Sequence, residues 1–175
     1  MRPTKNVRKT NKTLLIVGEG DTEEAFLKHL KSLLVARDSG LSVAIKNAGG
    51  KGALYAINYT INQIGDYDCR AALFDTDTDW NQDVAAKARQ NHIETLDSEP
   101  QIEAVFLRVL GEKTQSKSAA QLKKGFTDFL QNNGFEKAHF DQKFTLDFWQ
   151  DARKKEPMLE RLLSFLEGKF KKKGE

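Results

Sequence analysis

The sequence predicts an α/β protein whose parallel sheet of about four strands is flanked by helices. Short apolar runs that end at glycine or at acidic residues alternate with segments whose apolar residues recur at helical spacing. Strand–helix units repeated three or four times are typical of a parallel sheet wrapped by helices. A chain of 175 residues suits one domain with small additions.

The expected strands cover residues 13–17, 41–45, 70–74 and 92–96. Helices are expected at 22–36, 53–64, 83–90 and 102–110, and most of the remaining chain is helical. Asp21 is the expected N-cap of the first helix, with Glu24 completing a capping box. Gly65 should end the second helix, and Pro100 should start the fourth.

Three segments follow from this pattern. Residues 1–12 form a basic arm, residues 13–131 form the α/β domain, and residues 132–175 form a helical extension that packs on the core. The basic arm and the lysine-rich C-terminal end would attract the phosphate backbone of a nucleic acid. The alternative interpretation is that both ends are simply solvated.

Composition points to a soluble protein in a reducing, cytoplasmic setting. The longest apolar runs are too short to cross a membrane, so no membrane partner is expected. No apolar segment follows the basic N-terminus, so no secretion signal is expected. The single cysteine, Cys69, cannot form an internal disulfide.

Ligands of such sheets bind beyond the carboxyl ends of the strands, which selects the loops at 18–23, 46–52, 75–81 and 97–103. Three of these loops are acidic. Glu19 directly follows the first strand between two glycines, and it is the candidate catalytic residue and a candidate metal ligand. Acids in the first turn of a helix also complement its dipole, which explains Asp21 and Glu24 without any other role.

The third loop contains Asp75, Asp77 and Asp79. Residues two apart on an extended chain face the same side, so these carboxylates are expected to converge. Like charges at one place need a cation, and oxygen ligands without histidine or cysteine favour Mg²⁺ or Mn²⁺, or Ca²⁺. Asp75 and Asp77 are therefore candidate metal ligands and Asp79 is a further one, unless the loop is an acidic surface turn.

The fourth loop adds Glu103, while Ser98 is the expected cap of the helix that follows. Carboxylates from separate strand ends are the usual metal ligands in two-metal phosphoryl transfer. The proposed set of ligands is Glu19, Glu23, Asp75, Asp77 and Glu103. Lys46 and Lys51, on the second loop, are candidate phosphate-binding residues, although solvated lysines would look the same.

A strand ending in Glu-Gly, followed by a later strand ending in Asp-x-Asp, resembles the TOPRIM domain. The stretch Glu19-Gly-Asp-Thr-Glu23 is similar to the form found in OLD-like and RloB-like proteins, and Ser98-x-Pro100-x-x-Glu103 is similar to an RloB-like segment. The resemblance covers about residues 13–110. It implies a Rossmann-like fold with Glu19 as metal ligand or general acid/base. Asp75 and Asp77 would be the metal-binding pair, and Glu23 and Glu103 would complete a second site.

The resemblance also implies Mg²⁺-dependent nuclease or nicking activity in restriction or phage defence, with DNA favoured over RNA as the partner. An ATPase or restriction-system partner would be a separate protein, because the chain has no phosphate-binding Gly-x-x-x-x-Gly-Lys loop. Two alternatives stay open. One is a non-catalytic module that binds metal or nucleic acid. The other is a phosphatase of the haloacid-dehalogenase type, which Asp75-Thr-Asp77-Thr resembles but whose motif belongs to the first strand.

Overall fold

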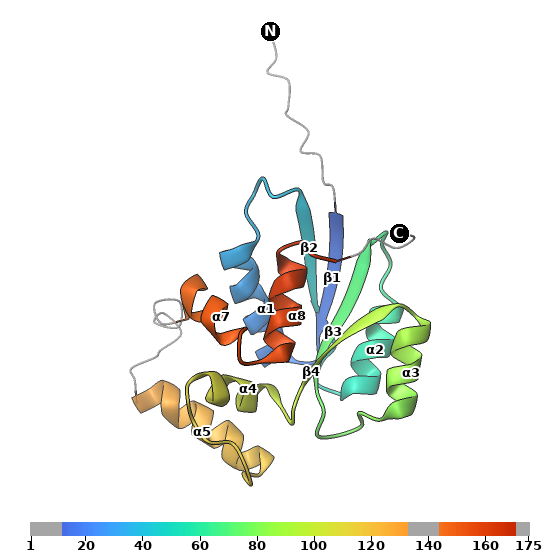
Figure 1. Ribbon diagram of the computed structural model, residues 1–175. Coiled ribbons are helices and arrows are strands. Elements are labelled where there is room, and N and C mark those ends of the chain that lie inside the picture. Colours follow the sequence, from blue (N-terminus) through green and yellow to red (C-terminus); the bar gives the residue numbers. More distant parts are fainter. Residues whose placement is uncertain (1–11, 133–143, 171–175) are drawn as a thin grey trace.

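Four parallel strands form one sheet in the order β2-β1-β3-β4, as the sequence predicts. The computed structural model describes residues 12–132 and 144–170. The strands are β1 (Lys12–Gly18), β2 (Leu41–Asn47), β3 (Cys69–Asp75) and β4 (Ile93–Ser98). Their carboxyl ends share one edge, the lower one in Figure 1, and the arrangement is consistent with a Rossmann-like fold.

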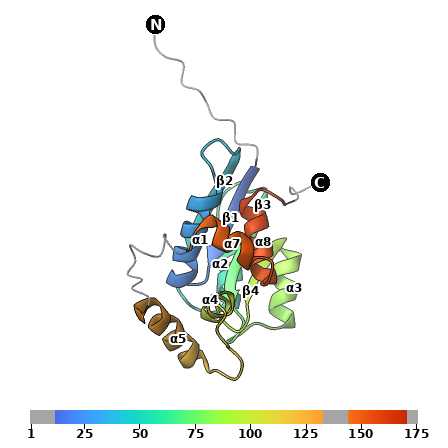
Figure 2. The same ribbon diagram turned by 60° about the vertical axis from the view of Figure 1, so that its left-hand side comes forward.

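Helices cover both faces of the sheet (Figures 1 and 2). They are α1 (Asp21–Leu34), α2 (Ala53–Ile61), α3 (Gln82–Gln90), α4 (Ile102–Val109), α5 (Ala119–Asn132), α7 (Leu146–Ala152) and α8 (Pro157–Leu166). One core lies under α1, α4 and α8, and a second core lies under α2 and α3. No helix within these described residues is long and apolar enough to span a membrane.

Strand alternation explains the two cores. Leu14 and Ile16 of β1 point into the first core, while Leu15 and Val17 point into the second, and all four are fully buried. The C-terminal helices belong to the first core. There the fully buried Trp149 of α7 packs against Phe26, with ring centroids 5.1 Å apart.

The start of α1 differs from the prediction by one residue. Its N-cap is Gly20, and the Glu23 carboxylate accepts the Gly20 N–H at 2.9 Å. Asp21 is already helical, and both Asp21 and Glu24 accept hydrogen bonds from the Asn47 amide, at 2.7 and 3.2 Å. The predicted Asp21/Glu24 capping box is therefore wrong, because the acid one residue earlier reaches back to the chain entering the helix.

The end of α2 also lies earlier than predicted. The helix ends at Ile61 rather than near Gly65. The Arg70 guanidinium donates to the carbonyls of Thr60 and Ile61 at 3.1 and 3.2 Å, and to that of Gly65 at 2.9 Å. A cation from the next strand thus satisfies the carbonyls left free at the helix end.

Helix α4 begins at Ile102, so Pro100 lies outside it and the prediction that Pro100 starts the helix is wrong. Ser98 does not cap the helix either, because it is the last residue of β4. The N–H of Ile102 instead donates to the Asp75 carboxylate at 2.9 Å. A residue distant in sequence has taken the role of a local cap.

Candidate metal centre

Glu19 and Asp75 meet at the carboxyl edge of the sheet. Glu19 follows the last residue of β1, and Asp75 is the last residue of the neighbouring β3. One carboxylate oxygen of Glu19 accepts the backbone N–H of Asp75 at 3.0 Å. The structure therefore brings together these two residues, which the sequence placed in different loops.

Both carboxylate oxygens of Glu19 accept backbone hydrogen bonds. The second oxygen accepts the N–H of Gly52 at 3.1 Å. The backbone of Glu19 bonds to the same two segments, since its N–H donates to Leu73 and its carbonyl accepts from Gly50, at 2.8 and 2.7 Å. Glu19 is thus held between β3 and the loop that precedes α2, and each oxygen keeps further lone pairs for another partner.

Asp75 sits among like charges. Burial raises its pKa, and the charges of Glu23, Glu103 and Glu19 add to this effect, so that the pKa is about 8 despite the opposing hydrogen bond from the Ile102 N–H. A carboxyl group in this position holds a proton near neutral pH unless a cation replaces it.

Glu23 belongs to the same group of acids. Its side chain is only 6% exposed, and burial raises its pKa, with Glu19 and Glu103 adding to the effect. The first turn of α1 comes close to β1 at Gly18, where a Cβ atom would lie 2.9 Å from the Cβ of Glu23. A glycine at position 18 is what lets this acidic turn rest on the end of the sheet.

Glu103 completes the cluster from α4. It is 8% exposed, and its Oε2 atom is buried without a hydrogen-bond partner among the described residues. Ser98 Oγ and Gln101 Oε1 are buried in the same state, just before α4. Sequence reasoning gave Ser98 only a capping role and missed Gln101, because neither residue type signals an unpartnered buried oxygen. Such groups are costly, and an ordered water or a bound ion is a usual explanation.

Glu19, Glu23, Asp75 and Glu103 together are called the buried acid cluster, in which Glu23 and Glu103 are buried and Glu19 and Asp75 are half-buried. Within residues 12–132 and 144–170, no lysine, arginine or histidine forms an ion pair with any of them. Arg108 of α4 is nearby in sequence, but its guanidinium binds Glu156 at 2.6 and 2.9 Å. Among the described residues, the cluster therefore has no basic side chain as a counterion.

The other acids of the third loop lie in different surroundings. Strand β3 ends at Asp75 and residues 76–79 bend, so the alternation expected to align Asp77 and Asp79 with Asp75 stops there. Asp77 is exposed. Asp79 accepts the N–H groups of Ala53 and Leu54 at 2.7 and 3.2 Å, and it therefore caps α2.

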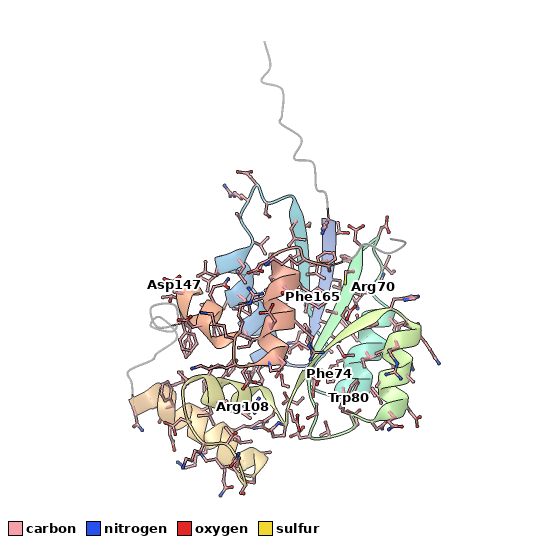
Figure 3. All side chains as sticks on the ribbon, viewed as in Figure 1. Arg70, Phe74, Trp80, Arg108, Asp147 and Phe165 are labelled. Atoms are coloured by element: carbon pink, nitrogen blue, oxygen red, sulfur yellow. The ribbon has the colours of Figure 1, made fainter. Side chains whose placement is uncertain are left out.

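Trp80, next in the chain, packs under this loop (Figure 3). Its ring lies 4.7 Å from that of Phe74, measured between centroids. The two candidate phosphate-binding lysines, Lys46 and Lys51, are both exposed. The Lys51 ammonium lies 4.9 Å from the centroid of the Tyr55 ring.

The donor chemistry of the cluster fits a hard divalent cation, since every ligand on offer is an oxygen. The buried, unpartnered Glu103 oxygen and the raised pKa of Asp75 fit it as well. Among the described residues, no three histidine, cysteine, aspartate or glutamate side chains are already arranged around a common point at binding distance. The carboxylates would therefore have to move together to share one ion.

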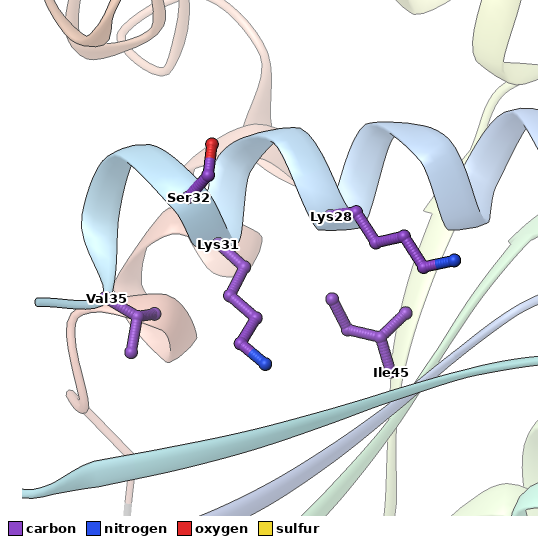
Figure 4. Close-up of a pocket in the computed structure, with 5 residues that line it drawn as sticks. All are labelled: Lys28, Lys31, Ser32, Val35 and Ile45. Atoms are coloured by element: carbon purple, nitrogen blue, oxygen red, sulfur yellow. The ribbon is translucent and has the colours of Figure 1, made fainter. Parts of the chain in front are cut away.

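A pocket at another place on the molecule is basic (Figure 4). It lies over β2, along α1, with Lys28, Lys31 and Ile45 among its lining residues. Both lysines are engaged, because Lys28 pairs with Glu24 at 2.7 Å and Lys31 donates to the Val43 carbonyl at 2.6 Å. They supply no counterion to the buried acid cluster.

No family model matches the chain, and neither the curated proteins nor the solved structures contain a significant match. The geometry of the cluster therefore carries the functional argument.

Proposed function

We propose that the chain is a TOPRIM-like, metal-dependent enzyme that acts on phosphodiester bonds of nucleic acid. The observation that carries this proposal is the position of the half-buried Asp75 among three other carboxylates, where its pKa is raised to about 8. Like charges gathered at a strand edge destabilise the folded protein unless a functional role compensates for the cost. Carboxyl groups with perturbed pKa values are typical of functional sites.

The proposed ligands of Mg²⁺ or Mn²⁺ are Asp75, Glu23 and Glu103, with Glu19 beside them. Asp75 and Glu103 are both tied to the start of α4, while Glu23 comes from α1, so the site is held by separate elements. Asp77 stays a candidate ligand on the exposed side. When bound, a divalent cation neutralises a phosphate and lowers the pKa of an attacking water.

Glu19 is proposed as the catalytic acid/base. Its carboxylate is fixed by the N–H groups of Gly52 and Asp75, at 3.1 and 3.0 Å. A fixed carboxylate beside a substrate phosphate can accept the proton of an attacking water through its remaining lone pairs. The resemblance to OLD-like and RloB-like proteins supports nucleic acid as the substrate and a role in restriction or phage defence, with an ATPase as a separate partner.

The test is a cleavage assay on purified protein with plasmid, linear duplex, single-stranded DNA and RNA, in Mg²⁺, in Mn²⁺ and in chelator. The proposal expects cutting of at least one substrate in metal and none in chelator. Equal cutting by Asp75→Asn and wild type would contradict the role proposed for Asp75, whether the cutting comes from this chain or from a contaminating nuclease. Absence of cutting by wild type would remove the enzyme proposal.

One observation supports a second candidate, a non-catalytic module that binds metal or nucleic acid. Both Glu19 oxygens already accept backbone hydrogen bonds, which suits a residue that shapes the loops rather than one that moves protons. Metal binding without cutting, in the same assay series, would select this candidate.

A further inference from the structure

Helix α2 presents an uncharged, partly aromatic face to solvent. The helix has no acidic residue in its first turn and no basic residue in its last, and its sequence contains no charge at all. Leu54 and Tyr55 are 38% and 39% exposed. A surface helix normally turns charged side chains to water, so this face is suited to contact with another molecule.

Two tyrosines on this face have stacked rings. Tyr55 and Tyr59 are four residues apart, and their rings are stacked with centroids 6.4 Å apart and planes 29° apart. Tyr59 is partly buried against the second core. The pair is therefore anchored at one end by packing and open to solvent at the other, at Tyr55.

A positive charge lies beside this pair of tyrosines. The Lys51 ammonium lies 4.9 Å from the centre of the Tyr55 ring. Lys46 leaves β2 on the same side as Ala44, which packs against the core under α2, because residues two apart on a strand share a face. Both lysines are exposed, and no described acidic residue forms an ion pair with either.

The start of α2 is joined to the buried acid cluster by a hydrogen bond. The N–H of Gly52, directly before α2, donates to Glu19 at 3.1 Å. Tyr55 follows within the first turn of the helix. A chain resting on Tyr55 would therefore have its neighbouring phosphate close to the acids at the end of the sheet.

We propose that the α2 face, made of Lys51, Tyr55 and Tyr59, binds single-stranded nucleic acid. Tyr55 stacks on an unpaired base, and Lys51 contacts a phosphate. The inference rests on the proposed function and narrows its substrate to strands with unpaired bases, because paired bases inside a duplex cannot reach a tyrosine ring. The absence of charge on α2 suits base stacking, which tolerates any sequence.

Binding is measured with the full chain in chelator, so that cutting does not interfere. The probes are labelled oligothymidylate and oligouridylate of about 15 nucleotides, and a DNA duplex of equal length. Tyr55→Ala is expected to weaken binding of the single strands on the order of 10-fold, and to leave duplex binding unchanged. Tyr55→Phe keeps the ring and should bind as wild type does.

Ile64→Ala is the matched control, since Ile64 is 97% exposed beyond the end of α2. It should have no effect on either probe. Lys51→Ala should lower the slope of log affinity against log salt by about 0.7, the value for one phosphate contact on a single strand. Preference for DNA or RNA is read from the two single-stranded probes.

Photocrosslinking of wild type keeps the test independent of folding of the variants. Oligonucleotides with bromodeoxyuridine should crosslink to the tryptic peptide of residues 52–70, at Tyr55 or Tyr59. Crosslinks confined to other peptides, or an equal loss of single-strand and duplex binding in Tyr55→Ala, would overturn the inference. Cutting that fails while this binding persists would overturn the proposed function alone.

Discussion

The buried acid cluster and the turn that follows β3 both contain carboxylates, yet their surroundings differ. Asp75 lies among Glu19, Glu23 and Glu103, and its pKa is raised to about 8. Two residues on, Asp77 is exposed, and Asp79 caps α2. Spacing alone therefore does not give two aspartates the same surroundings. Asp75 differs in being half-buried beside other acids, with no ion pair to a basic residue in the described part of the chain.

The largest effect should come from comparing Asp75→Asn with Asp77→Asn in the cleavage assay. Removal of a buried ligand charge should lower cutting on the order of 10³-fold, equivalent to several kcal/mol of lost stabilisation. The exposed Asp77→Asn should lose about 10-fold or less, because solvent already screens that charge. Equal losses in the two variants would break the comparison.

Glu19→Gln should lower cutting on the order of 10²-fold while nucleic-acid binding stays within about two-fold of wild type. The glutamine keeps the shape and loses the negative charge and basicity. Its amide group must also face one of the two N–H groups that Glu19 accepts, so a local hydrogen bond is lost. Binding and cutting are measured on the same oligonucleotide, and unchanged cutting would remove Glu19 from the mechanism.

Stability should depend on pH through Asp75. In the unfolded chain its pKa is the usual value of about 4, whereas in the folded protein it is about 8. Between these values the folded state holds a proton that the unfolded state lacks, so stability falls as pH rises from about 4 to about 8. In chelator at pH 8, Asp75→Asn should therefore be more stable than wild type by ~2 kcal/mol, a value reduced to allow for partial exposure.

Chemical denaturation across this pH range gives the measurement. Asp77→Asn serves as the control and should follow the wild-type curve. Parallel curves for wild type and Asp75→Asn would contradict the raised pKa of Asp75 and, with it, the charge excess of the buried acid cluster.

The smallest effect concerns Asp79. Asp79→Ala removes the carboxylate that accepts the N–H groups of Ala53 and Leu54, and it should cost ~1 kcal/mol of stability. Affinity for Mn²⁺ should not change, because Asp79 is occupied as a helix cap. A large loss of Mn²⁺ affinity with unchanged stability would assign Asp79 to the metal site.

The sheet and the edge that carries the acids were predictable from the sequence. The apolar runs that precede Glu19 and Asp75 mark strand ends, and parallel strands bring such ends to one edge. Roles within that edge were harder to predict. Asp75 binds the start of α4, and Arg70 binds the end of α2, through contacts between segments that no local pattern encodes.

The start of α1 was also hard to predict from the local sequence. Gly20, Asp21 and Glu23 allow two capping registers that differ by one residue, and packing of the helix on Gly18 decides between them. The arrangement of the acids in the third loop depends on where β3 ends. Alternation predicted a shared side for Asp75 and Asp77, but the strand that would impose this alternation ends at Asp75, where the chain bends.

The most direct test of the central claim is a calorimetric titration of Mn²⁺ into wild type, Asp75→Asn and Asp77→Asn, without nucleic acid. We predict that Asp75→Asn weakens Mn²⁺ binding about 10- to 100-fold and that Asp77→Asn stays close to wild type. Equal affinity of wild type and Asp75→Asn for Mn²⁺ would contradict the assignment of the buried acid cluster as the metal centre.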